Sequence, residues 1–270
     1  MKKKIIILIS SIIIFILFFT YFSSMLNKKR VNKELSSLKA SAYVLNDVEV
    51  YQLDEIPALS KHYILYSLNK KINIRRMAEF SYYKKLTSNN NIDHYKGKTY
   101  LGIYKPCILS TEEKNTHSFL WKNNREFYIE GFGNILTKFM SAVTTNSIRG
   151  DEAAIICFVK YILSTPYVPF ILYNKALVNY ISGDSNHIVV TFKDEQFIVN
   201  CKISFDENKI TEIAYFDDNR DSTSITFMAK YTNYNEINGA IIPMVSSIEI
   251  YQDNNLIEQY IIEIEDYRFY

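Results

Sequence analysis

An alternation of apolar and polar residues is the clearest pattern in the second half of the chain. Over residues 197–206 every second side chain is apolar, and most of the side chains between them are polar. A period of two is typical of a β-strand with one buried face. Turn residues such as Asn238-Gly239 separate similar segments, which predicts an antiparallel meander. Its other strands are expected at residues 177–181, 187–193, 209–216, 224–232, 240–251 and 256–269.

The first half of the chain contains shorter runs of the same kind. Gly131 and Gly133 interrupt the last of them, which predicts a turn there. A helix is expected before these runs, from Asp54 to about Lys70, with Pro57 in its first turn. The strands are predicted at residues 72–86, 98–109, 117–122 and 126–131.

A helix with apolar residues on nearly every side is predicted between the two strand-rich parts, at residues 151–164. Asp151 is its expected N-cap, and Thr165-Pro166 ends it. Such a helix must be covered all round. The predicted fold class is therefore mainly β (α+β): a curved antiparallel meander sheet packed around a buried helix, preceded by one N-terminal transmembrane helix.

The transmembrane helix is predicted from residues 5–22, which carry no charge and are long enough to cross a hydrocarbon core of about 30 Å. A cleavable signal peptide is the alternative. Its apolar region would be shorter, about 7–15 residues, and would end at a small-x-small site, which does not follow Phe22. We expect an uncleaved anchor at residues 1–30.

A heptad pattern follows the anchor and predicts a helical stalk over residues 31–52, with one β-rich domain at 53–270. Two heptads are short for a coiled coil. The stalk is therefore expected to lie on its own domain or on the membrane, with homodimerisation as the alternative. The pattern consists of Val31, Leu35, Leu38, Ala42 and Leu45.

Charge is distributed unevenly along the chain. The net charge is +2, but residues 1–30 hold basic and no acidic residues, which leaves residues 31–270 mildly acidic. A nucleic-acid partner is not expected, because such binding needs a clustered basic face. Basic residues flank both ends of the span, so charge alone does not orient it. The very short N-terminal tail predicts a single pass in the cytoplasmic membrane with the C-terminal domain outside the cytoplasm.

The order of a buried helix, Tyr167-Val168-Pro169 and a long meander carries a family resemblance. Its matching positions are Gly131, Gly133, Lys160, Tyr161, Pro169, Gly239 and Pro243. On these residues, positions 56–270 resemble an uncharacterised bacterial family described only as a domain of unknown function. The resemblance implies a curved sheet similar to that of lipoprotein-carrier proteins and assigns no reaction. Ser164 stands where a Glu is common, so any activity of that Glu would be missing here.

Catalytic and metal-binding motifs do not stand out in the sequence. The four histidines are far apart, and the three cysteines, Cys107, Cys157 and Cys201, form no CxxC pair and are expected to be buried thiols. No cofactor or metal is predicted. An envelope hydrolase using dispersed carboxylates such as Asp217, Asp218 or Glu130 remains the alternative function.

The leading hypothesis is a non-enzymatic, membrane-anchored binding module of the cell envelope. Its partners would be the membrane, through residues 5–22, and an apolar or lipid-like ligand or an envelope protein. The ligand would lie between the alternating strand and the buried helix, because pockets recruit apolar side chains. Close-packed core is the alternative for the same residues. The expected contacts are Phe197, Val199, Cys201, Ile203, Phe205, Ile155, Phe158 and Ile162.

Overall fold

Strands dominate the computed structural model, which describes residues 2–43, 50–69, 75–88, 91–117, 120–215 and 225–270. Within these residues, thirteen strands form one sheet. All neighbouring pairs are antiparallel, and each strand pairs with the next along the chain except where β1 pairs with β13. The strands are β1 (Met77–Ser88), β2 (Asn91–Gly102), β3 (Cys107–His117), β4 (Leu120–Ile129), β5 (Phe132–Phe139), β6 (Val143–Arg149), β7 (Val178–Gly183), β8 (His187–Asp194), β9 (Phe197–Asp206), β10 (Lys209–Tyr215), β11 (Ile225–Ile237), β12 (Ala240–Gln252) and β13 (Asn255–Phe269).

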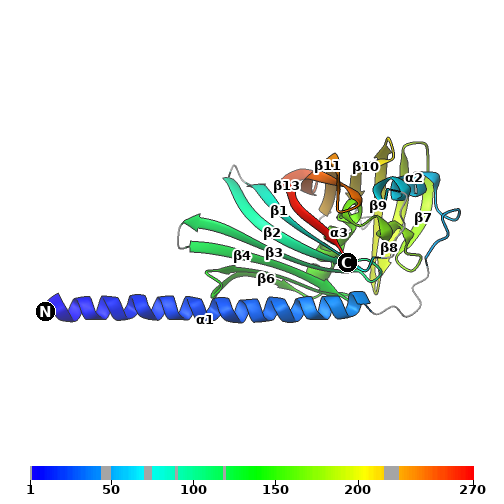
Figure 1. Ribbon diagram of the computed structural model, residues 1–270. Coiled ribbons are helices and arrows are strands. Elements are labelled where there is room, and N and C mark those ends of the chain that lie inside the picture. The colour runs from blue at the N-terminus through cyan, green and yellow to red at the C-terminus, as the bar shows by residue number, and fades with distance from the viewer. Residues whose placement is uncertain (1, 44–49, 70–74, 89–90, 118–119, 216–224) are drawn as a thin grey trace.

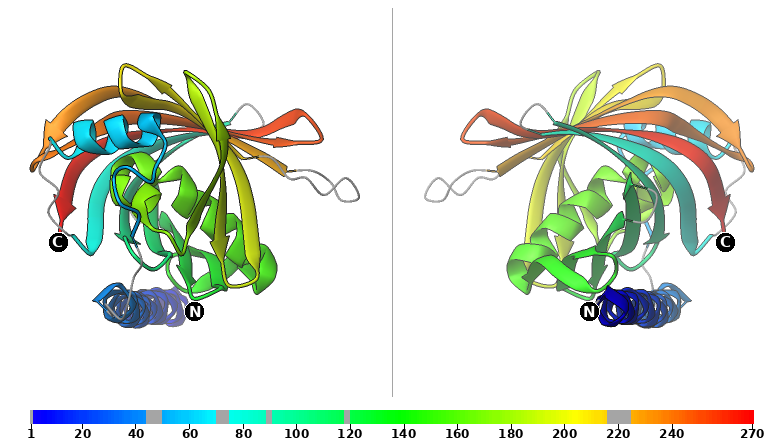
Figure 2. Two further views of the ribbon diagram at one scale, coloured as in Figure 1. Left: turned by 90° about the vertical axis from the view of Figure 1, so that its right-hand side faces the viewer. Right: turned by 90° about the vertical axis from the view of Figure 1, so that its left-hand side faces the viewer.

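Two meanders make up this sheet, β1–β6 and β7–β13. Their outer strands, β6 and β7, are the two edges of the sheet. The chain passes from one edge to the other through α3 (Asp151–Leu163) and two 3₁₀ helices, η1 (Thr165–Tyr167) and η2 (Pro169–Tyr173). The sheet curves around α3, as Figure 2 shows. The predicted fold class is confirmed.

Helices lie on both faces of the sheet. On the concave face, α2 (Ala58–Ser67) packs beside η2, β10 and β12. On the outer face, α1 (Lys2–Tyr43) contacts β2, β3 and β4. Figure 2 shows α1 nearly end-on outside the sheet, with α3 inside it. In Figure 1 the N-terminal half of α1 projects beyond the domain.

The predicted meander of the second half is confirmed strand by strand. Its Asn238-Gly239 turn has φ of 52° and 82°, as a primed hairpin turn requires. The first half is predicted less well. The strand expected at residues 98–109 is wrong, because it combines the end of β2 with the start of β3 across the bend at 103–106. β5 was missed because Gly133 was interpreted as part of a turn, and β6 because it is polar and largely exposed.

Gly133 has a packing role inside β5. A Cβ at this position would lie 2.1 Å from the backbone nitrogen of Ala154 and 2.3 Å from its Cα. Only glycine therefore allows β5 to approach the start of α3 so closely. The expected N-cap was wrong: Gly150, with φ of 76°, holds that position, and Asp151 is the first helical residue. The helix after Asp54 likewise begins later, after Pro57.

Tyrosine hydroxyls hold α3 and η1 against the sheet. Tyr231 on β11 donates to the carbonyl oxygen of Leu163, and Tyr267 on β13 donates to that of Tyr167, both at 2.5 Å. Tyr63 on α2 donates to the carbonyl oxygen of Pro166 at 3.1 Å. Carbonyls at a helix C-terminus lack partners within the helix. These tyrosines supply the missing donors from elements far away in the sequence.

The heptad pattern of α1 faces its own domain. Leu38 and Ala42 are fully buried against Met77, Cys107 and Leu109, while Val31 and Leu35 are partly buried on the same cluster. Leu45 lies outside the described residues. From Val31 to Ala42 the predicted stalk therefore rests on its own domain, and one uninterrupted helix, which ends at Tyr43, joins it to the apolar segment. Homodimerisation stays a prediction, but this face of α1 is already covered.

Candidate functional site

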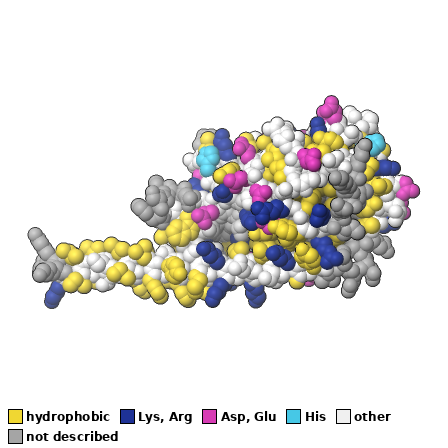
Figure 3. Space-filling model, viewed as in Figure 1, with side chains coloured by type: hydrophobic (Ala, Val, Ile, Leu, Met, Phe, Trp, Pro, Cys, Tyr) yellow, Lys and Arg dark blue, Asp and Glu magenta, His cyan; other side chains and the backbone are white. Residues whose placement is uncertain are grey.

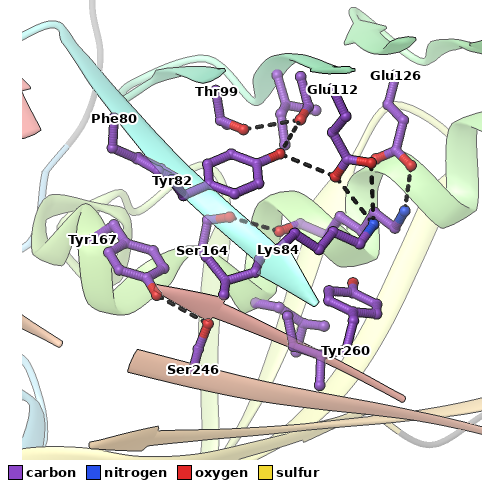
Figure 4. A pocket seen from close by; sticks show the side chains of 16 residues that line it. Phe80, Tyr82, Lys84, Thr99, Glu112, Glu126, Ser164, Tyr167, Ser246 and Tyr260 are labelled. Carbon is purple, nitrogen blue, oxygen red and sulfur yellow. Dashed lines mark hydrogen bonds and ion pairs between the residues drawn. The ribbon is translucent and has the colours of Figure 1, made fainter. Parts of the chain in front are cut away.

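A small cavity lies on the concave side of the sheet, between the sheet and α3. Its volume is about 50 Å³. That is room for a few water molecules, whereas ligand sites usually measure about 300–1,000 Å³. Figure 4 shows that its lining combines aromatic rings, such as Phe80 and Tyr167, with charged side chains. Ser164, where the family resemblance expects a Glu, also lines it. We call this space the inner cavity.

Two ion pairs meet in the inner cavity, one of them buried and the other partly buried. Lys84 contacts Glu112 at 3.0 Å, and Lys160 contacts Glu126 at 2.5 Å. Glu112 also accepts a hydrogen bond from Tyr82. Burial alone would raise the pKa of Glu112, but the positive charges of Lys84 and Lys160 outweigh it and lower that pKa. An ionised carboxylate held by lysine is a weak base, so this arrangement favours a structural role over general-base catalysis.

The eight residues expected to contact a ligand lie close together, in the core. Seven are buried, and Ile155 is partly buried against them. The cavities described here are lined by other residues. The inward face of β9 packs against α2 at one point, where the Phe205 ring lies 6.1 Å from the Tyr63 ring. A ligand site at these residues stays a prediction, and it would require the core to open.

A much larger cavity lies on the other face of the sheet. It measures about 680 Å³ and runs between residues 24–32 of α1 and the outer sides of β1–β5. Gly97 forms part of its floor, and Trp121, the one Trp of the chain, forms part of its wall. The indole nitrogen of Trp121 donates to Ser141 at 3.1 Å, which fixes the ring. We call this space the outer groove.

Arg125 on β4 is the most deeply buried cation of the outer groove. Its side chain is 5% exposed, and its Nε lies 3.2 Å from Glu34 of α1. Nε, Nη1 and Nη2 of Arg125 are buried and have no hydrogen-bond partner among the described residues. Burial lowers the pKa of Arg125 and raises the pKa of Glu34. The pair is therefore incompletely satisfied.

A third cavity, of about 240 Å³, holds carboxylates at the β4–β5 and β8–β9 turns. Asp194 accepts a hydrogen bond from Tyr128 at 2.5 Å. Burial raises the pKa of Asp194 to about 6. Glu130, one of the carboxylates considered for a hydrolase, is largely exposed and lies 3.7 Å from Lys105. The other two, Asp217 and Asp218, lie outside the described residues.

Metal ligands do not gather in the part of the chain that the structure describes: no group there brings together three His, Cys, Asp or Glu side chains. The three cysteines are free and buried, as expected. Apart from Lys160, which the family resemblance names, the charged residues of the inner cavity and the outer groove were missed from the sequence. A sequence signal for two of them was present. Alternate residues of a strand share one face, so Lys84 lies on the same face as Phe80 and Tyr82. Arg125 lies on the same face as Phe127 for the same reason.

Comparison with known proteins identifies one family. The sequence profile of a family of unknown function, DUF6920, matches residues 54–269. This confirms the resemblance to an uncharacterised family. A search of the curated proteins found no match.

Solved structures with a similar fold share little sequence with this chain. A DUF1329 family protein from Desulfovibrio piger is 9% identical, with a TM-score of 0.43 over 78% of this chain and 92% of its own. A LolA superfamily protein from Nitrosomonas europaea is also 9% identical, with a TM-score of 0.43 over 79% of this chain and 92% of its own. These similarities are too low to transfer a ligand or an activity.

Proposed function

Because this chain belongs to the DUF6920 family of unknown function, we propose a function from the geometry of its own residues. The protein is a membrane-anchored binding module of the cell envelope. Residues 5–22 of α1 cross the cytoplasmic membrane, the domain lies outside the cytoplasm, and the outer groove takes a lipid-like ligand at the membrane surface.

The position of the outer groove carries this proposal. The groove is the largest of the cavities described, and at about 680 Å³ it falls within the usual range of ligand sites. Its wall on α1 begins at Ser24, immediately after the apolar span. Large apolar side chains between Ile5 and Phe22 are exposed, as a membrane-crossing helix requires. Figure 3 shows them on the projecting part of α1, with Lys and Arg side chains where the helix reaches the domain.

The direction of the hairpins agrees with this placement. The ends of the β1–β2 and β3–β4 hairpins point toward the same side as the N-terminus of α1 (Figure 1). Trp121 lies near the start of β4, at this end. Tryptophan is enriched at membrane interfaces because its ring is apolar and its N–H is polar. The membrane end of the groove therefore has the side chain expected at an interface.

Quenching of Trp121 tests the proposal. The full chain would be reconstituted into vesicles containing lipids with brominated acyl chains, with excitation at the red edge where Tyr does not absorb. We expect strong quenching relative to unbrominated vesicles. In parallel, protease added to intact spheroplasts should digest the domain and leave the N-terminus protected. An unquenched Trp121, or a domain protected from protease, contradicts the proposal.

The hydrolase alternative is favoured by one observation, the convergence of Glu112 and Glu126 in the inner cavity. It is disfavoured by the lysine on each carboxylate. A hydrolytic activity that disappears in Glu126→Gln while the melting temperature is kept would replace the binding function with this one.

A further inference from the structure

Trp121 in the outer groove is held in place by a strained turn. Its indole N–H donates to the hydroxyl of Ser141, which in turn donates to the side-chain carbonyl oxygen of Asn123, both at 3.1 Å. Ser141 is 3% exposed and lies in the turn between β5 and β6, next to Met140. Both turn residues have positive φ, 58° and 51°, where Asn and Gly are usual. The turn therefore keeps a disfavoured residue whose hydroxyl orients the ring, and backbone strain of this kind gathers at functional sites.

The depth of Trp121 along α1 follows from the neighbouring ion pair. β4 starts at the hairpin end that points toward the N-terminus of α1, so the two elements run in the same direction along the groove (Figure 1). Arg125 of β4 contacts Glu34 of α1. Trp121 is four strand residues, about 13 Å, closer to the span, which corresponds to about nine helix residues and to the level of Met25. Met25 lies about 4.5 Å beyond Phe22, and a headgroup layer extends about 5–8 Å beyond the hydrocarbon core, so with the proposed span the ring lies at headgroup depth.

Uncharged hydrogen-bonding side chains lie on the opposite wall of the groove at this level. Ser24 and Asn27 of α1 flank the level of Met25, and both line the groove. Both are partly exposed, and neither the Ser24 hydroxyl nor the Asn27 amide has a hydrogen-bond partner in the part of the chain that the structure describes. Together they offer donors and acceptors of hydrogen bonds to a ligand beside the ring.

The charges of the groove disfavour a cationic headgroup. Lys28 and Lys138 line the groove, and neither has a carboxylate within ion-pair distance among the described residues. A choline or ethanolamine ammonium would meet these two positive charges. A phosphate could contact the two lysines but would leave the aromatic ring unused, and the free donors of Arg125 are buried away from the groove surface. An aromatic face beside neutral hydrogen-bonding groups suits an uncharged polar headgroup.

We propose that the outer groove binds the sugar headgroup of a glycolipid, with one face of the sugar ring stacked on Trp121. This inference rests on the function proposed above and adds the class of ligand. A pyranose ring carries C–H groups on its faces and hydroxyls around its edge. The C–H groups have partial positive charge and pack on the electron-rich face of an indole. The edge hydroxyls both donate and accept hydrogen bonds, as the Ser24 hydroxyl and the Asn27 amide do.

Retention of matched lipids by the full chain tests the inference. The protein would be reconstituted in phosphatidylcholine nanodiscs that contain equal amounts of monoglucosyl diacylglycerol, diacylglycerol and phosphatidylglycerol with the same acyl chains. After gentle extraction, native mass spectrometry would identify the retained lipid. We expect the glucosyl lipid to be retained over diacylglycerol, from which it differs only by the sugar, and over phosphatidylglycerol. Trp121→Leu should lower this preference about fivefold, the contribution of one aromatic face, whereas Trp121→Phe should retain part of it.

Two glycine substitutions in one turn separate the orientation of the ring from the stability of the fold. Ser141→Gly removes the hydroxyl that holds Trp121, but glycine adopts positive φ without strain, so the variant should fold. Its preference for the glucosyl lipid should fall about twofold or more. Met140→Gly is the matched control, because it relaxes the same turn at a residue that does not line the groove, and the preference should persist. Thermal unfolding checks each variant; if the Trp121 variants unfold, Ser141→Gly against Met140→Gly decides.

The outcomes separate the two proposals. Equal retention of the glucosyl lipid and diacylglycerol, preferential retention of phosphatidylglycerol, or a preference unchanged in both Trp121→Leu and Ser141→Gly overturns the stacked sugar and leaves a lipid-binding groove. Absence of any retained lipid together with an unquenched Trp121 overturns the proposed function itself. Methyl glucoside is the third arm, in a detergent without a sugar headgroup. If it displaces the glucosyl lipid and shifts Trp121 emission, the ligand is a soluble or polymeric glycan and the lipid source is wrong.

Discussion

At the scale of single residues, the inward face of β9 shows how the same pattern serves a core or a ligand site. Cys201 has no exposed surface, and the cavities described lie elsewhere. Close-packed interiors leave no room for added volume. The strict alternation of residues 197–206 predicted which side chains point inward, but it could not distinguish packed core from cavity.

Cys201→Phe separates these two roles. We expect a loss of stability of about 1–3 kcal/mol, because the larger side chain must displace its neighbours. Thermal or denaturant unfolding measures it. Ile198→Phe is the control, on the same strand but 62% exposed, and should change little. A Cys201→Phe variant with unchanged stability and lost retention of lipid would place the ligand in the core after all.

Asp194 makes stability depend on pH. Burial raises its pKa from 3.8 to about 6 in the folded protein. Between these values the folded state binds more protons than the unfolded state, so the free energy of unfolding falls as pH rises through this window. Asp194→Asn cannot ionise. It should be more stable than the parent above pH 6 by about 1 kcal/mol, after allowing for solvent screening of a partly exposed group.

Unfolding curves at several pH values check this. The difference between Asp194→Asn and the parent should disappear below pH 3.8, where both side chains are neutral. Glu207→Gln removes a carboxylate from an exposed turn and serves as the control. A pH-independent difference would mean that Asn changes the hydrogen bond with Tyr128 rather than the charge.

At the scale of elements, local patterns predicted those helices and strands that depend on neighbouring residues in the sequence. The helix at 151–163 and the seven strands from β7 to β13 follow from period and turn residues. The pairing of β1 with β13 could not be predicted, because these strands lie at opposite ends of the domain sequence. The tyrosine contacts with α3 are equally non-local. The outer groove was missed for the same reason, since it forms only where α1 lies beside strands that are distant from it in the sequence.

Leu38 tests the docking of α1 on the sheet. It is fully buried against Met77, Cys107 and Leu109. Leu38→Ala should weaken this contact by about 2–4 kcal/mol, through lost burial and the cavity left behind. Hydrogen exchange of residues 31–43 should rise. Lys39→Ala, one position away and exposed, is the control. Unchanged protection in Leu38→Ala would mean that α1 is held by contacts other than this cluster.

At the scale of the whole molecule, the proposed function makes α1 the element that sets the distance between membrane and domain. It is one helix from Lys2 to Tyr43, with its first half exposed and its last turns buried on the sheet. If residues 5–22 cross the membrane as proposed, a continuous docked helix fixes the height of the outer groove above the bilayer. The proposed ligand contact depends on that height, whereas the fold of the domain does not.

A longer α1 separates ligand binding from the fold of the domain. An insertion of about seven helix-forming residues between Phe22 and Ser23 adds roughly two turns, so the domain keeps its orientation but rises by about 10 Å. This exceeds the headgroup layer of about 5–8 Å. We expect the melting temperature of the domain to stay the same, while Trp121 quenching by brominated lipid and retention of co-purified lipid both fall. The same insertion in the β7–β8 turn, after Asp184, adds equal length far from α1 and should leave lipid retention intact. If the lengthened α1 retains lipid as before, the groove does not take its ligand from the headgroup layer, and the position of the span is irrelevant to binding.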